Sequence, residues 1–112
     1  MAALFLALGK IPIPNAGQPV QVVAPPSMNP PSCHAVIIEA LPTNTGKIYI
    51  GLQDLDKVSL AQVLIILPVP TVNLLPTFSI AVTVAGNAIN IGNLWLDADN
   101  SGEGVLLSAL VA

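Results

Sequence analysis

The residues best suited to chemistry lie in one acidic segment. Asp97, Asp99 and Ser101 offer oxygen atoms at alternate positions and Gly102 follows, as in the first half of a calcium-binding EF-hand loop. The second half does not match, because Ser108 stands where a bidentate glutamate is required and an apolar run replaces the exiting helix. We interpret the segment as an acidic β-turn, with a weak calcium site at Asp97, Asp99 and Ser101 as the alternative.

No other set of side chains matches a catalytic motif. Cys33 and His34 are the only cysteine and histidine, and adjacent residues of a strand point to opposite faces, so they cannot easily share a metal ion or a proton. Asp54 and Asp56 form a looser acidic pair, without the opposing environments that acid–base catalysis needs. The sequence predicts no enzyme and no cofactor, and a metal-dependent hydrolase would depend on the acidic segment alone.

The elements that position these residues are predicted to be short β-strands. Alternating residues 77–85, the turn residues Gly86-Asn87 and alternating residues 88–91 predict a hairpin. The β-branched run 33–40, a turn-rich segment and residues 47–51 predict a second strand pair. Further strands are expected over residues 4–10, 18–23, 63–67, 94–97 and 105–111, with at most a short turn within 55–66. The expected fold is all-β: a single domain over residues 1–112, built as a jelly-roll-like β-sandwich or barrel of about eight short strands.

The chain has few charged side chains for a soluble protein. They make up 8% of its 112 residues, against about 25% in a typical domain, and none occurs from Val58 to Leu96. Pro68, Pro70 and Pro76 interrupt this uncharged segment, which therefore does not resemble a membrane-spanning helix of roughly 20 apolar residues. Protein is expected to cover part of the surface, and no membrane association is predicted.

Self-association is the favoured explanation for this surface. The net charge of −3 and the absence of arginine give no footprint for nucleic acid. Contacts are expected in residues 4–14, 24–31 and 63–75, and residues 1–14 and 24–31 could be extended arms. The continuously apolar run 64–75 is the expected subunit contact. The contact residues proposed on this basis are Leu4, Leu6, Ile11, Ile13, Pro25, Pro26, Met28, Leu64, Ile66, Val69, Val72, Leu74 and Leu75.

The order of three motifs resembles small β-rich structural proteins of tailed bacteriophages. The apolar run 33–40 precedes Asn44-Thr45-Gly46 and a strand that ends at Gly51. Leu94-Trp95-Leu96-Asp97-Ala98, the turn Ser101-Gly102-Glu103-Gly104 and a last apolar strand close the chain. The resemblance covers residues 33–112, and this chain departs from it in the apolar residues 61–76, where relatives tend to carry a glycine-rich, polar segment.

This resemblance implies a capsid cement or decoration protein with a jelly-roll-like sandwich. Such a protein is often a trimer and lies across junctions between major capsid subunits. It would be made in the cytoplasm of the bacterial host and located in the virion. The resemblance implies no catalytic residues, and its partners would be further copies of the chain and the major capsid protein or another virion protein.

Use in the phage tail or baseplate is the alternative, either as a structural part or as a receptor-binding module. A module that binds carbohydrate needs exposed aromatic side chains, and only Phe5, Tyr49, Phe78 and Trp95 are available. Tyr49 and Phe78 belong to apolar strands, where burial is expected. Trp95 could anchor either the core or an interface.

Overall fold

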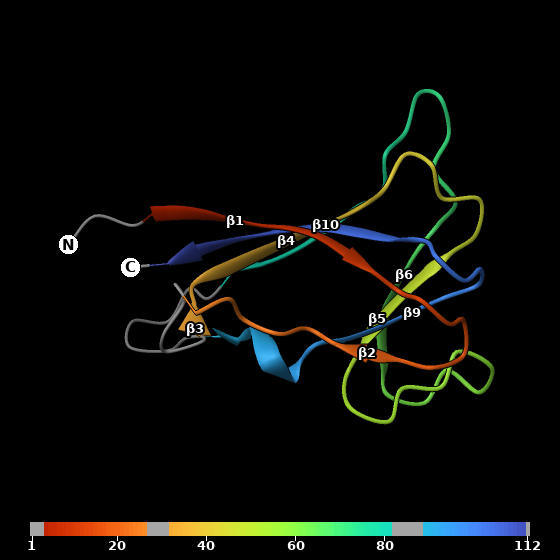
Figure 1. Ribbon diagram of the computed structural model, residues 1–112, viewed down its shortest axis with the longest axis horizontal. Coiled ribbons are helices and arrows are strands. Elements are labelled where there is room, and N and C mark those ends of the chain that lie inside the picture. Colours follow the sequence, from red (N-terminus) through yellow and green to blue (C-terminus); the bar gives the residue numbers. More distant parts are fainter. Residues whose placement is uncertain (1–3, 27–31, 82–88, 112) are drawn as a thin grey trace.

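The computed structural model describes residues 4–26, 32–81 and 89–111, which form a sandwich of two antiparallel β-sheets (Figure 1). The first sheet has the order β1 (Leu4–Pro12), β10 (Gly104–Val111), β4 (Ala35–Ala40) and β7 (Thr77–Ala81). The second has the order β2 (Val20–Gln21), β9 (Trp95–Ala98), β5 (Ile48–Gly51) and β6 (Val63–Leu67). A small third sheet joins β3 (Ser32–Cys33) to β8 (Ile89–Asn90). The predicted all-β sandwich is confirmed, and the sheets do not close into a barrel.

The strands pair like one long hairpin rolled upon itself. β1 pairs with β10, β2 with β9, β3 with β8, β4 with β7 and β5 with β6, so that each pair encloses the next along the chain. β10 also pairs with β4, and β9 with β5, which joins the first pair to the fourth and the second pair to the fifth. This nested order is that of a jelly roll. The loop between β5 and β6 is the tip of the rolled hairpin.

The core lies between the two sheets and follows the two-residue period of the strands. In β4, Val36 and Ile38 point inward and are fully buried, whereas Ile37 between them is exposed. The largest fully buried apolar side chains come from both sheets and belong to one cluster. They include Ile38 and Leu107 of the first sheet and Ile48, Ile50, Leu67 and Leu96 of the second.

The predicted pairing of residues 33–40 with residues 47–51 is wrong. β4 pairs with β10 and β7 in the first sheet, whereas β5 pairs with β6 and β9 in the second. Residues 41–47 therefore cross from one sheet to the other, a separation of about 10 Å in β-sandwiches. The run 33–40 is also divided, because β3 ends at Cys33 and β4 begins at Ala35.

The predicted hairpin over residues 77–91 lies partly outside the described residues, since its turn falls within 82–88. In the described part, β7 lies against β4 and β8 lies against β3. After β8 the chain forms a short 3-10 helix, η1 (Ile91–Asn93), which the sequence did not predict. The side chain of Asn90 caps it by accepting a hydrogen bond from the Gly92 N–H at 2.9 Å.

Residues 4–12 are an integral strand and not an extended arm, because β1 pairs with β10 along its length. The pairing shifts between Ala7 and Gly9, and Gly9 has a φ of 83°, a conformation that glycine adopts at little cost. Beyond β1, the Ile13 N–H donates to the Glu103 carbonyl and the Ile13 carbonyl accepts from the Gly102 N–H, both at 2.8 Å. Ile13 is 0% exposed and belongs to the core, so its proposed contact role is wrong.

Candidate functional site

The acidic segment after β9 joins loops that are distant in the sequence. Asp97 is buried, and its Oδ1 accepts hydrogen bonds from the backbone N–H groups of Gly17 at 2.9 Å and Ala98 at 2.8 Å. Asp99 Oδ1 accepts from the Tyr49 hydroxyl at 2.9 Å, and its Oδ2 accepts from the Lys47 N–H at 3.2 Å. Burial raises the pKa of Tyr49, and the hydrogen bond and negative charge of Asp99 raise this pKa further.

The three proposed calcium ligands bind two other parts of the protein, since Asp97 and Ser101 both contact the loop at Ala16 and Gly17. Asp97 bonds to the loop at Gly17, Asp99 bonds to β5 and the residue before it, and Ser101 Oγ accepts from the Ala16 N–H at 2.9 Å. Within residues 4–26, 32–81 and 89–111, no group of three or more His, Cys, Asp or Glu side chains could hold a metal ion. The hydrogen bonds favour the interpretation as an acidic turn.

A second set of contacts holds the crossover loop 41–47 to the turn before β10. Asn44 is 4% exposed; its Nδ2 donates to the Gly104 carbonyl at 2.8 Å, and its Oδ1 accepts from the Gly104 N–H at 3.2 Å. The Glu103 carboxylate accepts from the Thr45 N–H at 2.5 Å, the Gly46 N–H at 2.9 Å and the Thr45 hydroxyl at 3.0 Å. We call this set of contacts the loop junction.

Sequence reasoning missed the loop junction, although it noted both of its halves as motifs. Asn44 lies 60 residues before Gly104, and no local pattern shows that two turns this far apart bind each other. Gly104 gave part of the information, because a glycine at the start of a strand can indicate a close approach of another backbone. A Cβ atom at this position would lie 2.2 Å from the Ile11 carbonyl oxygen, so only glycine fits against β1 here.

The loop junction makes a pH-dependent contribution to stability. Partial burial raises the pKa of Glu103, but hydrogen bonds from Thr45, Gly46 and Asn100 outweigh it, and the net pKa lies below the ordinary value of 4.5. A carboxyl group whose pKa is lower in the folded than in the unfolded state stabilises the fold above the unfolded pKa, and this stabilisation is lost as the pH falls through the folded pKa.

We therefore expect Glu103→Gln to have a lower melting temperature than wild type at pH 7. The difference in melting temperature between the two proteins should decrease progressively as the pH falls below 4.5. Thermal unfolding of both chains between pH 7 and pH 3 measures this difference. Backbone hydrogen bonds from Val58 and Ser59 lower the pKa of Asp56 in both proteins. The pH dependence that Asp56 causes is therefore the same in both and cancels in the difference. A difference that stays constant with pH would show that the Glu103 charge does not strengthen the junction.

The Cys33–His34 pair occupies the break between β3 and β4. Cys33 is 1% exposed; burial raises the pKa of its thiol, and a backbone hydrogen bond with Ala35 opposes this in part. The His34 N–H donates to the Leu110 carbonyl at 2.7 Å, and its side chain is half-buried. This placement fits the structural interpretation of both residues.

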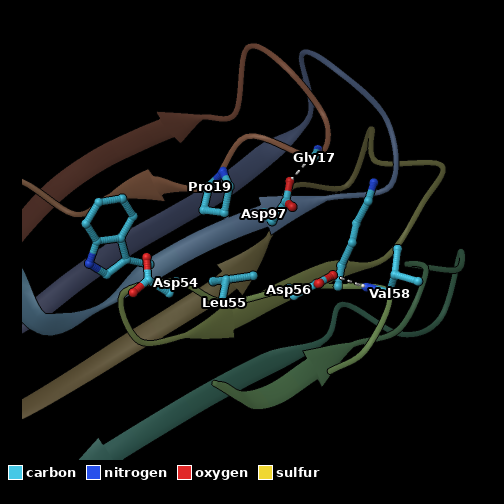
Figure 2. Close-up of a pocket in the computed structure, with 9 residues that line it drawn as sticks. Gly17, Pro19, Asp54, Leu55, Asp56, Val58 and Asp97 are labelled. Carbon is cyan, nitrogen blue, oxygen red and sulfur yellow. Dashed lines mark hydrogen bonds between the residues drawn. The ribbon is translucent and has the colours of Figure 1, made fainter. Parts of the chain in front are cut away.

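An open cleft of about 500 Å³ lies on the outer side of the second sheet (Figure 2). Gly17, Pro19 and Asp97 line one side, and residues 54–58 line the other. Trp95 also lines this cleft, and it borders an adjoining hollow of about 330 Å³ formed with Gln21, Gln53 and Asn93, among others. Trp95 is half-buried while its neighbour Leu96 is 0% exposed, so the tryptophan belongs to the outer face and is not a core anchor.

The second surface of interest is apolar and includes β6. Leu64 and Ile66 are exposed on this strand, and Val69, Val72, Leu74 and Leu75 are exposed in the loop 68–76 that follows. We call these six residues the apolar surface. The loop is the green-to-teal segment that extends from the top of the molecule in Figure 1. It is closed by two backbone hydrogen bonds between Thr71 and Leu74, at 2.9 and 3.2 Å.

The remaining proposed contact residues are less available. Leu6 and Ile11 are half-buried and pack against the core. Pro25 is half-buried and Pro26 is exposed. Met28 lies outside the described residues, and the structure does not describe the side chain of Leu4. Of the twelve exposed large apolar side chains among the described residues, six lie within 64–75, and the other six are spread over five segments of the chain.

The described residues thus form a jelly-roll β-sandwich with a cleft beside Trp95 and an exposed apolar surface on β6 and the loop 68–76. Comparison of the chain with protein-family models, with curated proteins and with solved structures finds no match. No helix in the described part of the chain is long and apolar enough to cross a membrane.

Proposed function

We propose that this chain is a structural protein of a tailed-bacteriophage particle: a capsid cement or decoration protein that forms a trimer and stabilises junctions between major capsid subunits. The observation that carries the proposal is the apolar surface. Val72 is 102% exposed, Leu74 is 56% exposed and Leu64 is 52% exposed, in a protein with few charged groups to keep such a surface in solution.

None of the six residues of the apolar surface is charged, so covering their side chains desolvates no charge of their own. The total accessible surface of 6350 Å² exceeds the roughly 5,800 Å² that surface scaling gives for a monomer of 11.5 kDa. An interface of standard size covers about 800 Å² of each partner. The accessible surface of this protein is therefore larger than that of a typical monomer of the same mass, which is compatible with association.

The position of β6 also supports assembly. β6 is at the edge of the second sheet, and the structure pairs it with β5 alone among the described strands. Exposed edge strands pair readily with other chains unless charges, proline or bulges prevent it. β6 carries no charge, and Pro68 and Pro70 come only after it ends. Its pairing with β5 shifts register at Leu64, so the regular part of this edge is Ile65–Leu67. A second copy or a capsid subunit could contact this edge and the loop 68–76 together.

The assignment to a phage depends on the motif resemblance, and jelly rolls also occur in viral capsid and lectin domains. Fold alone does not establish function. The proposed role is structural and requires no catalytic residue or cofactor. The same apolar surface would also suit a component of the tail or baseplate.

Mass spectrometry and cryo-electron microscopy of the particles made by the encoding phage test this proposal. We expect the chain in stoichiometric amounts, with density at junctions of the capsid lattice and the loop 68–76 at a protein contact. Density on the tail would support the alternative location. Absence of the chain from purified particles would overturn the virion assignment.

A further inference from the structure

We propose that the cleft beside Trp95 binds a neutral oligosaccharide, with one sugar ring against the indole. The residues that line this cleft include none of the six residues of the apolar surface. The loop 52–62 that lines the cleft precedes β6, whereas the loop 68–76 follows it, so the two lie at opposite ends of this strand (Figure 1). A bound sugar would leave the loop 68–76 uncovered.

The position of Trp95 provides a platform for a ring. In β9, Trp95 lies between Gln21 of β2 and Gly51 of β5. Gly51 has no side chain, and the Gln62 carbonyl oxygen lies 2.1 Å from the position its Cβ would take, so the position accepts only glycine and the backbone of the loop 52–62 lies over it. The indole is thus half-exposed between two hollows, and an indole face packs well against the C–H face of a sugar.

The polar groups around the indole suit hydroxyl donors. The Asp56 carboxylate already accepts from the Val58 N–H at 2.8 Å, and that of Asp97 accepts from Gly17. The Asp54 carboxylate and the Trp95 indole N–H have no hydrogen-bond partner among the described residues. The carboxylate can accept a hydrogen bond from a ligand, and the indole N–H can donate one to it.

The charge and shape of the site define the class of ligand. Its walls carry Asp54, Asp56 and Asp97 against one cation, Lys57, whose Nζ donates to the Ala98 carbonyl at 2.8 Å. This negative balance disfavours sialylated, sulfated or phosphorylated glycans. The adjoining hollow is polar but uncharged, so an extended neutral ligand fits both sides of Trp95. The volumes of about 500 and 330 Å³ fall in the usual range for ligand sites, about 300–1,000 Å³.

The loop that presents Asp54 has an unusual backbone. The non-glycine residues with positive φ in the described part of the chain are Asp54 at 66°, Leu60 at 64° and Gln62 at 59°, and all three belong to this loop. Two backbone hydrogen bonds fix it, from the Leu52 N–H to the Gln62 carbonyl and from the Asp56 N–H to the Ala61 carbonyl, both at 2.9 Å. Such conformations concentrate at functional sites, and a fixed loop loses little entropy on binding.

The intrinsic fluorescence of Trp95 tests the proposal directly, because it is the only tryptophan of the chain. Wild-type protein is titrated with a panel of neutral oligosaccharides built from glucose, galactose, mannose or N-acetylglucosamine, and with sialylated and sulfated oligosaccharides and choline. We expect a saturable change with at least one neutral member and none with the acidic glycans. No saturable change with any neutral member at millimolar concentration would overturn the proposal, as would preferential binding of choline or of an acidic glycan.

Calorimetry with the neutral oligosaccharide that binds tightest identifies the residues involved. Trp95→Ala and Asp54→Gly should each weaken binding by at least about tenfold, and Trp95→Phe should retain part of it. Asp54→Gly keeps a backbone that tolerates positive φ, so its fold should persist even if Trp95→Ala is unstable. Val23→Ala, at a 78% exposed position outside both hollows, is the matched control. Unchanged binding in Asp54→Gly and in a folded Trp95→Ala would place the sugar elsewhere.

Discussion

Asn44→Ala is expected to lower the free energy of unfolding by about 2–3 kcal/mol, although it changes a loop residue that contacts no ligand. The side chain of Asn44 is 4% exposed and makes two hydrogen bonds with Gly104, at 2.8 and 3.2 Å. The Gly104 carbonyl keeps a second partner, the Leu41 N–H at 3.2 Å. The Gly104 N–H would lose its acceptor inside the protein, and a buried donor without a partner costs about 1–3 kcal/mol.

The position of this contact increases its importance. Asn44 belongs to the segment that crosses between the sheets, and Gly104 begins β10, which lies between β1 and β4. Loosening the junction therefore affects both layers of the sandwich. In a domain of this size the loss corresponds to a decrease of about 10 °C or more in melting temperature.

Chemical denaturation of Asn44→Ala and wild type at one fixed chain concentration measures the effect, since association would add to the apparent stability. Thr43→Ala is the matched control: Thr43 is the exposed neighbour in the same loop, and we expect a change within about 0.5 kcal/mol. Equal stability of both variants would show that the loop junction does not hold the sheets together.

The double variant Val72→Asp/Leu74→Asp is expected to dissociate the proposed trimer while the subunit stays folded. Both side chains are exposed in the monomer, and the turn that carries them is closed by backbone hydrogen bonds that do not need them. In the assembly the new carboxylates would have to leave water for an apolar contact, which is strongly unfavourable without a partner charge. We expect the dissociation constant to rise by at least about a hundredfold.

A control with the same added charge separates this effect from general repulsion. Val23→Asp/Val58→Asp places two carboxylates at positions that are 78% and 87% exposed, outside the apolar surface. Circular dichroism should give the same β-sheet signal for all three proteins. Dissociation of the control to the same extent as the loop variant would locate the interface elsewhere or show that net charge governs assembly.

The sequence predicted the positions of the strands better than their pairing. The bounds of β6 were predicted as they are observed, because an apolar run ends at Pro68, which cannot continue a central strand. The pairing of residues 33–40 with 47–51 failed for a different reason. A short turn-rich segment can close a hairpin or cross between sheets, and contacts with Gly104 and Glu103 decide which of the two it does.

The candidate sites show the same limit. The apolar surface could be predicted because the uncharged, apolar run that contains Leu64 and Leu74 is visible in the sequence itself and does not depend on a contact with a distant residue. Ile13 was misjudged because it belongs to the segment 4–14, which was expected to form contacts, whereas its backbone bonds to Gly102 and Glu103 hold the side chain inward. The cleft could not be predicted, because Trp95 meets the 54–58 loop and Gly17 only in the folded chain.

Sedimentation equilibrium of the purified wild-type chain at micromolar concentration tests the central claim most directly, namely that the apolar surface is a subunit interface. We predict a trimer with three times the 11.5 kDa mass of the chain, and a monomer for Val72→Asp/Leu74→Asp under the same conditions. A wild-type chain that sediments as a monomer, or a loop variant that assembles as fully as wild type, would contradict the claim.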